Sequence, residues 1–233
     1  MKKILLYSHF LLLLTACNSF NKDDFECLEG NCENGHGTAS YNDWTKWAGD
    51  TYTGEFKDGY RDGKGKYYDK DLDGTYTGEF SNNTFNGYGK MVFGEKSVHP
   101  GNSYTGEWKN GIRHGEGEES FGIGTYGGKY IGTFKNDSFN GYGTYYYPSG
   151  SIYEGEWLNG VKSGFGSFTD ENGNIHKGNW VNNKQSGKGE FTWIDGEIYI
   201  GNWKNGKYHG KGIYINKDGD TIECEYVNGV QIK

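Results

Sequence analysis

The feature that most constrains the fold is a short repeat of glycines and aromatic rings. In "NSYTGEWKNGIRHGEGE", residues 102–118, the rings of Tyr104 and Trp108 flank Gly106, and the same pattern returns along the chain. The pattern Tyr-x-Gly-x-(Phe/Trp) starts at Tyr52, Tyr76, Tyr104, Tyr130, Tyr153, His176, Tyr199 and Ile222. From Tyr130 the step is always 23 residues, after earlier steps of 24, 28 and 26. A short regular period predicts a stacked array in which each unit packs on its neighbours.

Each unit carries two turn signals. The first follows the Phe or Trp and is a pair such as Asn110-Gly111 or Asn159-Gly160. These residue types accept the positive φ angles of a two-residue type I′ turn. The second is a glycine shortly before the next start, such as Gly150. Two turns per unit leave room for two strands of about six residues, which is near the usual strand length.

The register around Asn110-Gly111 predicts one aromatic and one polar face. Counting back from the turn pairs Trp108 with Arg113, Gly106 with Gly115, and Tyr104 with residue 117. Side chains alternate along a strand, so the rings and the glycines share one face. Rings that lie over strand glycines offset the weakness that glycine brings to a strand. The residue two places after the last glycine completes this layer in most units, but Glu119 breaks the rule.

Composition limits how this sheet is covered. Glycine accounts for 41 of 233 residues and aromatics for 17 %, while hydrophobic residues reach only 33 %. Leu, Ile and Val are too scarce for a thick aliphatic core, and residues 42–233 show no helical pattern. The sequence therefore predicts an all-β fold: an elongated, single-layer, twisted antiparallel sheet of stacked hairpins with about sixteen strands.

These residues resemble the membrane occupation and recognition nexus (MORN) repeat. Its pattern is Tyr-x-Gly-x-Trp/Phe, then Gly or Asn, then Gly-x-Gly, and it covers residues 52 to about 229 and partly 27–41. Departures are His176 and Ile222 at the first Tyr, and Cys224 at the first Gly. The resemblance implies a β-hairpin ribbon that serves as an interaction or scaffold element, sometimes dimeric, without chemistry of its own. We expect residues 52–233 to form this domain, with about eight repeats and a degenerate last one.

The first residues differ in kind from the repeats. Lys2 and Lys3 precede a mostly apolar run that is too short to span a bilayer, and residues 1–16 are expected to be a signal peptide. The sequence Leu14-Thr15-Ala16-Cys17 resembles the bacterial lipobox, which implies a diacylglycerol on Cys17. Residues 17–26 are then a lipidated tether. Asn18 after Cys17 suggests sorting to the outer membrane, facing the periplasm or the surface.

The other cysteines suggest an oxidising compartment. Cys27 and Cys32 lie five residues apart within residues 27–51, the expected N-terminal cap and half repeat. A local disulfide is expected in an exported chain. A zinc site with His36 is a weaker alternative because no fourth ligand lies nearby. Cys224 is either a small packed residue in the last hairpin or a free thiol available for an intermolecular bridge.

Charge and motifs argue against several functions. Without residues 1–16, which hold two lysines and no acid, the formal charge is −9, so binding to nucleic acid is not expected. "GIGTYG", residues 122–127, fits Gly-x-Gly-x-x-Gly, but a strand rather than a helix follows it. No arrangement of His, Ser, Cys or carboxylates indicates catalysis. We therefore expect no enzyme activity, no cofactor and no metal.

The aromatic face is the feature that most suggests binding. A partner-binding groove is expected along its central part, formed by Tyr104, Trp108, Tyr130, Phe134, Tyr145, Tyr153 and Trp157. The alternative is that these rings pack only on each other and on the glycines. The expected function is a lipid-anchored envelope protein that uses this groove to bind a protein or a second copy. A second hypothesis is an envelope glycan-binding protein that uses the same rings.

Overall fold

The computed structural model describes residues 24–122 and 127–233. Every regular element in these residues is a β-strand, which confirms the all-β prediction. No helix in this part of the chain is long and apolar enough to cross a bilayer. The predicted signal peptide, residues 1–16, and the predicted lipidation site, Cys17, lie outside the described residues.

The strands are grouped into two compact units that share β9. The N-terminal unit holds β1 (Phe25–Gly30), β2 (Gly35–Tyr41), β3 (Thr51–Lys57), β4 (Tyr60–Asp69), β5 (Gly74–Ser81), β6 (Thr84–Phe93), β7 (Ser103–Lys109) and β8 (Ile112–Phe121). The C-terminal unit holds β10 (Ser138–Tyr146), β11 (Ile152–Leu158), β12 (Val161–Thr169), β13 (Ile175–Val181), β14 (Lys184–Thr192), β15 (Ile198–Lys204), β16 (Lys207–Ile215), β17 (Thr221–Val227) and β18 (Val230–Gln231). Of β9 (Gly128–Lys135), Tyr130–Thr133 belong to the C-terminal unit and the flanking residues to the N-terminal one.

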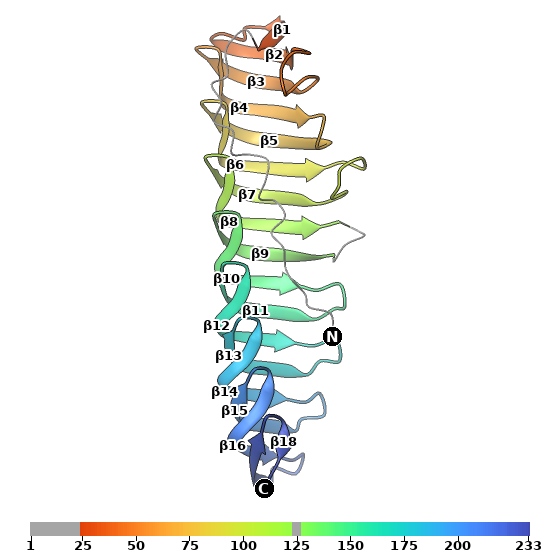
Figure 1. Ribbon diagram of the computed structural model, residues 1–233, viewed down its shortest axis with the longest axis vertical. Helices are drawn as coiled ribbons and strands as arrows, with labels where there is room; N and C mark the ends of the chain where they lie inside the picture. Colours follow the sequence, from red (N-terminus) through yellow and green to blue (C-terminus); the bar gives the residue numbers. More distant parts are fainter. Residues whose placement is uncertain (1–23, 123–126) are drawn as a thin grey trace. The chain divides into compact units, whose positions relative to one another are not determined.

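Within each unit, consecutive strands pair antiparallel and form a single layer of hairpins (Figure 1). The described residues contain eighteen strands, two more than expected, because β1 and β2 form a hairpin ahead of the first repeat. The disulfide between Cys27 and Cys32 is formed in this hairpin, as predicted. It joins β1 to the turn that leads into β2.

The turns inside the hairpins have the predicted type I′ backbone. Asn110 and Gly111 both have positive φ angles, 52° and 79°, and the equivalent pairs of the other repeats do too. The second residue of each turn also links the repeats. For example, the Gly111 amide donates to the Phe85 carbonyl in the preceding hairpin, and the Asn183 amide donates to the Lys162 carbonyl. Each turn therefore joins its hairpin to the one before it.

The predicted pairing of Gly106 with Gly115 is wrong. Trp108 does face Arg113, but Gly106 faces Gly117, and Tyr104 faces Glu119. Between these pairs β7 contributes one residue and β8 contributes three, so β8 carries a bulge with two extra residues. Gly115 lies in this bulge with a φ of +59°. Bulges of this kind bend the strand and increase its twist, which a count back from the turn does not include.

The predicted packing of rings over glycines is confirmed. The Tyr104 ring covers Gly106 and Gly117 so closely that a Cβ on either glycine would collide with its hydroxyl. That hydroxyl donates to the Glu107 carbonyl at 2.9 Å, and Tyr52 and Tyr76 make the same bond to residues three places ahead. Each of these rings also contacts the Phe or Trp of its own unit and that of the next one. Tyr104, for instance, meets Trp108 and Phe134 edge-on, at 5.1 and 4.9 Å.

Candidate binding surfaces

The seven side chains predicted to line an aromatic groove are buried. Their exposed fractions are 0–3 % for Tyr104, Trp108, Tyr130, Phe134, Tyr145, Tyr153 and Trp157. The expectation that the ribbon leaves these rings partly open is therefore wrong. Bulges bend the hairpins, and the rings close on each other and on the glycines to form the core of each unit. A partner-binding role for these seven residues stays a prediction that requires a change in the fold.

One position on this buried face alternates between a cation and a ring. It lies two residues after each hairpin turn and is occupied by Arg61, Phe85, Arg113, Phe139 and Lys162 in successive repeats. The phenylalanines stack on the first Tyr of their own unit, and Phe85 lies 3.8 Å from Tyr76 between ring centroids. Where the position holds a cation, the second residue of the next hairpin turn is Asn or Asp. The backbone amide of the cationic residue donates a hydrogen bond to that side chain, as the Arg113 amide does to Asp137 Oδ1 at 2.9 Å.

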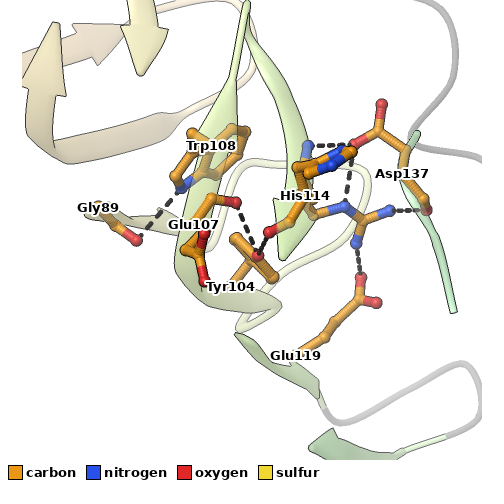
Figure 2. Close-up of polar contacts among 8 residues, drawn as sticks. Gly89, Tyr104, Glu107, Trp108, His114, Glu119 and Asp137 are labelled. Carbon is orange, nitrogen blue, oxygen red and sulfur yellow. Dashed lines mark hydrogen bonds and ion pairs between the residues drawn. The ribbon is translucent and has the colours of Figure 1, made fainter. Parts of the chain in front are cut away.

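Arg113 is the centre of a buried charged cluster in the N-terminal unit, and its two carboxylate partners, Glu119 and Asp137, are labelled in Figure 2. Its guanidinium donates to Glu119 Oε1 at 2.5 Å, to Asp137 Oδ1 at 3.1 Å and to the Asp137 carbonyl at 2.6 Å. Burial lowers the pKa of Arg113, but the two carboxylates outweigh it and hold the pKa above its ordinary value. Burial raises the pKa of Glu119, and Arg113 offsets only part of this. Glu119, which breaks the ring pattern, is thus explained by an ion pair.

Lys162 is the one cation of the three without a polar partner for its charged group in the described residues. Its ammonium lies 4.5 Å from the ring centroids of Tyr153 and Phe168, 4.9 Å from Trp180 and 5.2 Å from Tyr147. Ring faces attract a cation, but burial lowers the pKa of Lys162 to about 7. The cage is filled by the lysine itself, so it is part of the core and offers no room for a ligand.

An accessible concave surface lies on the opposite, polar face. A groove of about 540 Å³ runs over the polar face of β2 to β6 in the N-terminal unit. Lys64, Lys66, Lys90, His36 and Tyr88 contribute to its lining. Tyr88 is 58 % exposed even though it lies in a strand, because it is the central residue of a Gly-x-Gly segment on this face. The sequence predicts this face only as the polar side of the sheet.

The C-terminal unit repeats this exposure of rings on the polar face. Tyr142 and Phe165 occupy the same Gly-x-Gly position, and 57 % and 58 % of their surfaces are exposed. They are separated by one strand, β11, where Glu156 faces Tyr142 and accepts a hydrogen bond from the Phe165 amide at 2.9 Å. Accessible rings thus exist in this protein, but on the face opposite to the one predicted.

The remaining candidate groups have structural environments. Cys224 is a buried free thiol, which agrees with the first of its two alternatives, a small packed residue in the last hairpin, and burial raises its pKa. No group of three or more His, Cys, Asp or Glu side chains that could hold a metal ion occurs in residues 24–122 and 127–233. The predicted zinc alternative at His36 does not apply, because Cys27 and Cys32 are oxidised.

The repeats, the turns and the single layer together define a class of hairpin-repeat protein. The profile of the MORN repeat matches seven segments, namely residues 52–73, 76–98, 104–126, 130–152, 153–175, 176–198 and 199–221. The chain therefore belongs to the MORN repeat family. The seven matched segments begin at the first seven starts found in the sequence, and the degenerate eighth is not matched. MORN repeats are in general non-catalytic interaction modules.

Other comparisons add little. No curated protein gave a significant match to the chain. Among solved structures, the TCP domain of SAS-4 from Drosophila melanogaster, in complex with a proline-rich motif of Ana2, is 11 % identical with a TM-score of 0.41, covering 69 % of this chain and 82 % of that one. Virginiamycin B lyase from Staphylococcus aureus is 10 % identical with a TM-score of 0.18, covering 86 % and 73 %. These likenesses are too weak to indicate a function.

Proposed function

We propose that this chain is a non-enzymatic interaction module that holds a partner polypeptide on the polar face of its MORN repeats. The groove over β2 to β6 carries the proposal, because it is a concave and accessible surface of the N-terminal unit. Its floor includes the backbone of Gly65 and Gly78, whose opposite side is covered by the rings of Tyr52 and Tyr76. Exposed Tyr88 at its side supplies an apolar contact with a polar tip.

The proposal includes the site where the module acts. A lipid on Cys17 would hold the chain in the cell envelope, and the sequence of residues 1–18 supports the outer membrane, facing the periplasm or the surface. The disulfide between Cys27 and Cys32 agrees with an oxidising compartment. The intact mass of the protein from membranes is expected to show a diacylglycerol addition. A C17S variant should lack this mass and stay unprocessed; unmodified, water-soluble wild-type protein would contradict the anchor.

Site-specific photo-crosslinking in cells tests the binding surface. A photo-reactive amino acid replaces Tyr88 in the groove, and in a matched control it replaces Phe165, which is equally exposed at the same repeat position of the C-terminal unit. The proposal expects a discrete cross-linked polypeptide from position 88 that is absent from position 165. An equal pattern at both positions, or no polypeptide at position 88, would show that the groove does not hold a partner.

A second candidate function is glycan binding, which the exposed rings of Tyr142 and Phe165 favour. They lie on the same face, two strands apart, or about 10 Å, a spacing that suits stacking on successive sugars. This candidate expects the protein to pellet with purified peptidoglycan or another envelope polysaccharide. Pelleting should be lost when both rings are replaced by alanine; pelleting that persists in this variant rules these rings out.

A further inference from the structure

We infer that the polar groove of the N-terminal unit binds an extended, acidic peptide segment. This rests on the proposed function and specifies the chemistry of its partner. The groove lining contains three lysines, Lys64, Lys66 and Lys90, and one acid, Glu79. The whole chain has a formal charge of −7, so this patch has the opposite sign to the rest of the protein.

The residues of the groove form a row of hydrogen-bond donors across the strands. Successive pairings place Thr53, Lys66, Thr77 and Lys90 of the lining side by side on the polar face. This part of the row contains hydroxyl and ammonium groups and no carboxylate. Outside the groove the row continues through Thr38 to Glu29 at one end and through Thr105 to Glu118 at the other. The hydroxyls of Thr38 and Thr53 are 3.2 Å apart, so they can act as a pair. Such a row matches a ligand that offers acceptors and negative charge along its length.

The three lysines are available for a ligand. All three side chains are exposed, and none of the ion pairs found in residues 24–122 and 127–233 involves them. Lys64 faces Glu79 across the β4–β5 ladder without forming a salt bridge. The Glu79 carboxylate lies instead over Gly87 in the bulge of β6. The ammonium groups of the three lysines thus have no salt-bridge partner among the residues that the structure describes.

The form of the groove favours an extended peptide over a glycan. The groove crosses five strands, β2 to β6, which is about 19 Å at the usual strand spacing, or about six residues of extended chain. Its lining contains two accessible rings, the phenol of Tyr88 and the imidazole of His36, which lie on β6 and β2 at opposite ends of the groove and so cannot stack on successive sugars. A peptide can place carboxylates near Lys66 and Lys90 while its backbone bonds to the threonines. Occupation by an acidic segment therefore fits better than occupation by an acidic sugar chain.

Titration calorimetry with defined polymers tests the inference. The probes are poly-L-glutamate, poly-L-lysine and polygalacturonate of similar length, added to the purified protein at about 50 mM and 300 mM salt, since screening weakens exposed charge pairs. The test variant is K64Q/K66Q/K90Q. The matched control is K177Q/K188Q/K211Q, which removes the same charge from the polar face of the C-terminal unit. Circular dichroism confirms that both variants are folded.

The inference expects poly-L-glutamate to bind, at least tenfold more tightly than poly-L-lysine and more weakly at high salt. The test variant should lose at least tenfold in affinity, while the control stays within twofold of the wild type. No binding of poly-L-glutamate, equal losses in the two variants, or tighter binding of polygalacturonate would overturn the inference. A cross-link from position 88 that persists despite such a result would leave the proposed function standing and remove only the acidic specificity.

Discussion

Lys162 is expected to make the stability of the protein rise with pH in a range where few other groups titrate. Its ammonium is buried among four rings, and burial lowers its pKa from 10.5 to about 7. Between these two values the unfolded chain binds one more proton at this residue than the folded chain does. Stability therefore increases with pH from about 7 to 10.5, and it is lower at acid pH.

The size of the effect follows from this shift. Each unit of pKa difference corresponds to about 1.4 kcal/mol, so raising the pH from 7 to 9 should stabilise the fold by about 2 kcal/mol. Met has a similar length and no charge, so K162M should remove the slope and be more stable than the wild type at pH 7. The amide of residue 162 keeps its bond to Asn183 Oδ1 in this variant. Burial raises the pKa of the adjacent Tyr153 above its usual value, so that hydroxyl stays protonated up to pH 9.

Urea unfolding, followed by tryptophan fluorescence at pH 7, 8 and 9, measures the effect. The stability of K162M relative to the wild type should be largest at pH 7 and shrink by about 2 kcal/mol by pH 9. NMR titration of the lysine side chain gives the pKa of Lys162 directly. Parallel pH dependences for the two proteins would refute the reasoning, because they would mean that the four rings keep the ammonium fully charged in the folded state.

Three further changes test the packing of the buried face, each by urea unfolding. R113M should lose about 3–5 kcal/mol at pH 7, because two carboxylates remain buried without their cation, and the loss should shrink as Glu119 is protonated at lower pH; a loss below 1 kcal/mol would contradict the ion-pair account. G117A should lose about 1–3 kcal/mol by colliding with the Tyr104 ring, more than G160A, whose Cβ would meet nothing within 4 Å. H176Y should gain about 1 kcal/mol, because a tyrosine restores the hydroxyl hydrogen bond that this repeat lacks. Burial lowers the pKa of His176 to about 4, so the wild type should lose stability as the pH falls from 6.5 to 4, and H176Y should not. An unchanged acid slope in H176Y would refute this.

The hairpin turns and the ring pattern could be predicted because they depend on local chemistry. A pair such as Asn110-Gly111 adopts positive φ angles at both residues, and the glycines in the strands leave space for the Tyr104 ring. Both signals recur once per unit, so an insertion in one repeat does not shift the assignment of strands and turns in the next. The fold class and the family followed from these two signals alone.

The register could not be predicted by counting back from the turn. The extra residues sit around Gly115, whose positive φ places a bulge in β8. The sequence contains a sign of it, since the glutamate at the position of Glu107 recurs in several units. The Glu107 carboxylate accepts a hydrogen bond from the Glu116 amide at 3.1 Å and therefore supports the bulge. Counting back from Asn110-Gly111 would place Glu107 opposite His114, but the pairing of the two strands skips both residues because they lie at the bulge.

The same bends explain why the polar face is the accessible one, and not the aromatic face that the sequence predicts as the binding surface. A flat ribbon would leave rings such as Trp108 half open, but bent hairpins bring successive rings into edge-on contact and exclude the solvent. What remains accessible is the polar face, where the groove and exposed Tyr88 lie. Period-two alternation assigns residues to faces and contains no information about which face is concave. The ligand surface could therefore not be located without the bends.

The buried polar groups of the aromatic face do not all have hydrogen-bond or ion-pair partners, and this predicts which strands unfold locally first. Arg113 has two carboxylate partners, whereas the Lys162 ammonium has only rings. In the next repeats, the two ring nitrogens of His176 and the indole nitrogen of Trp203 have no hydrogen-bond partner among the described residues. In a repeat array each unit depends only on its neighbours, so such defects lower stability locally. Hydrogen exchange should therefore be faster in β13 and β14 than in β5 and β6, where Tyr76, Phe80 and Phe85 pack together. Local opening between residues 162 and 203 would leave the groove of the N-terminal unit intact, which separates the weakest part of the core from the proposed binding surface.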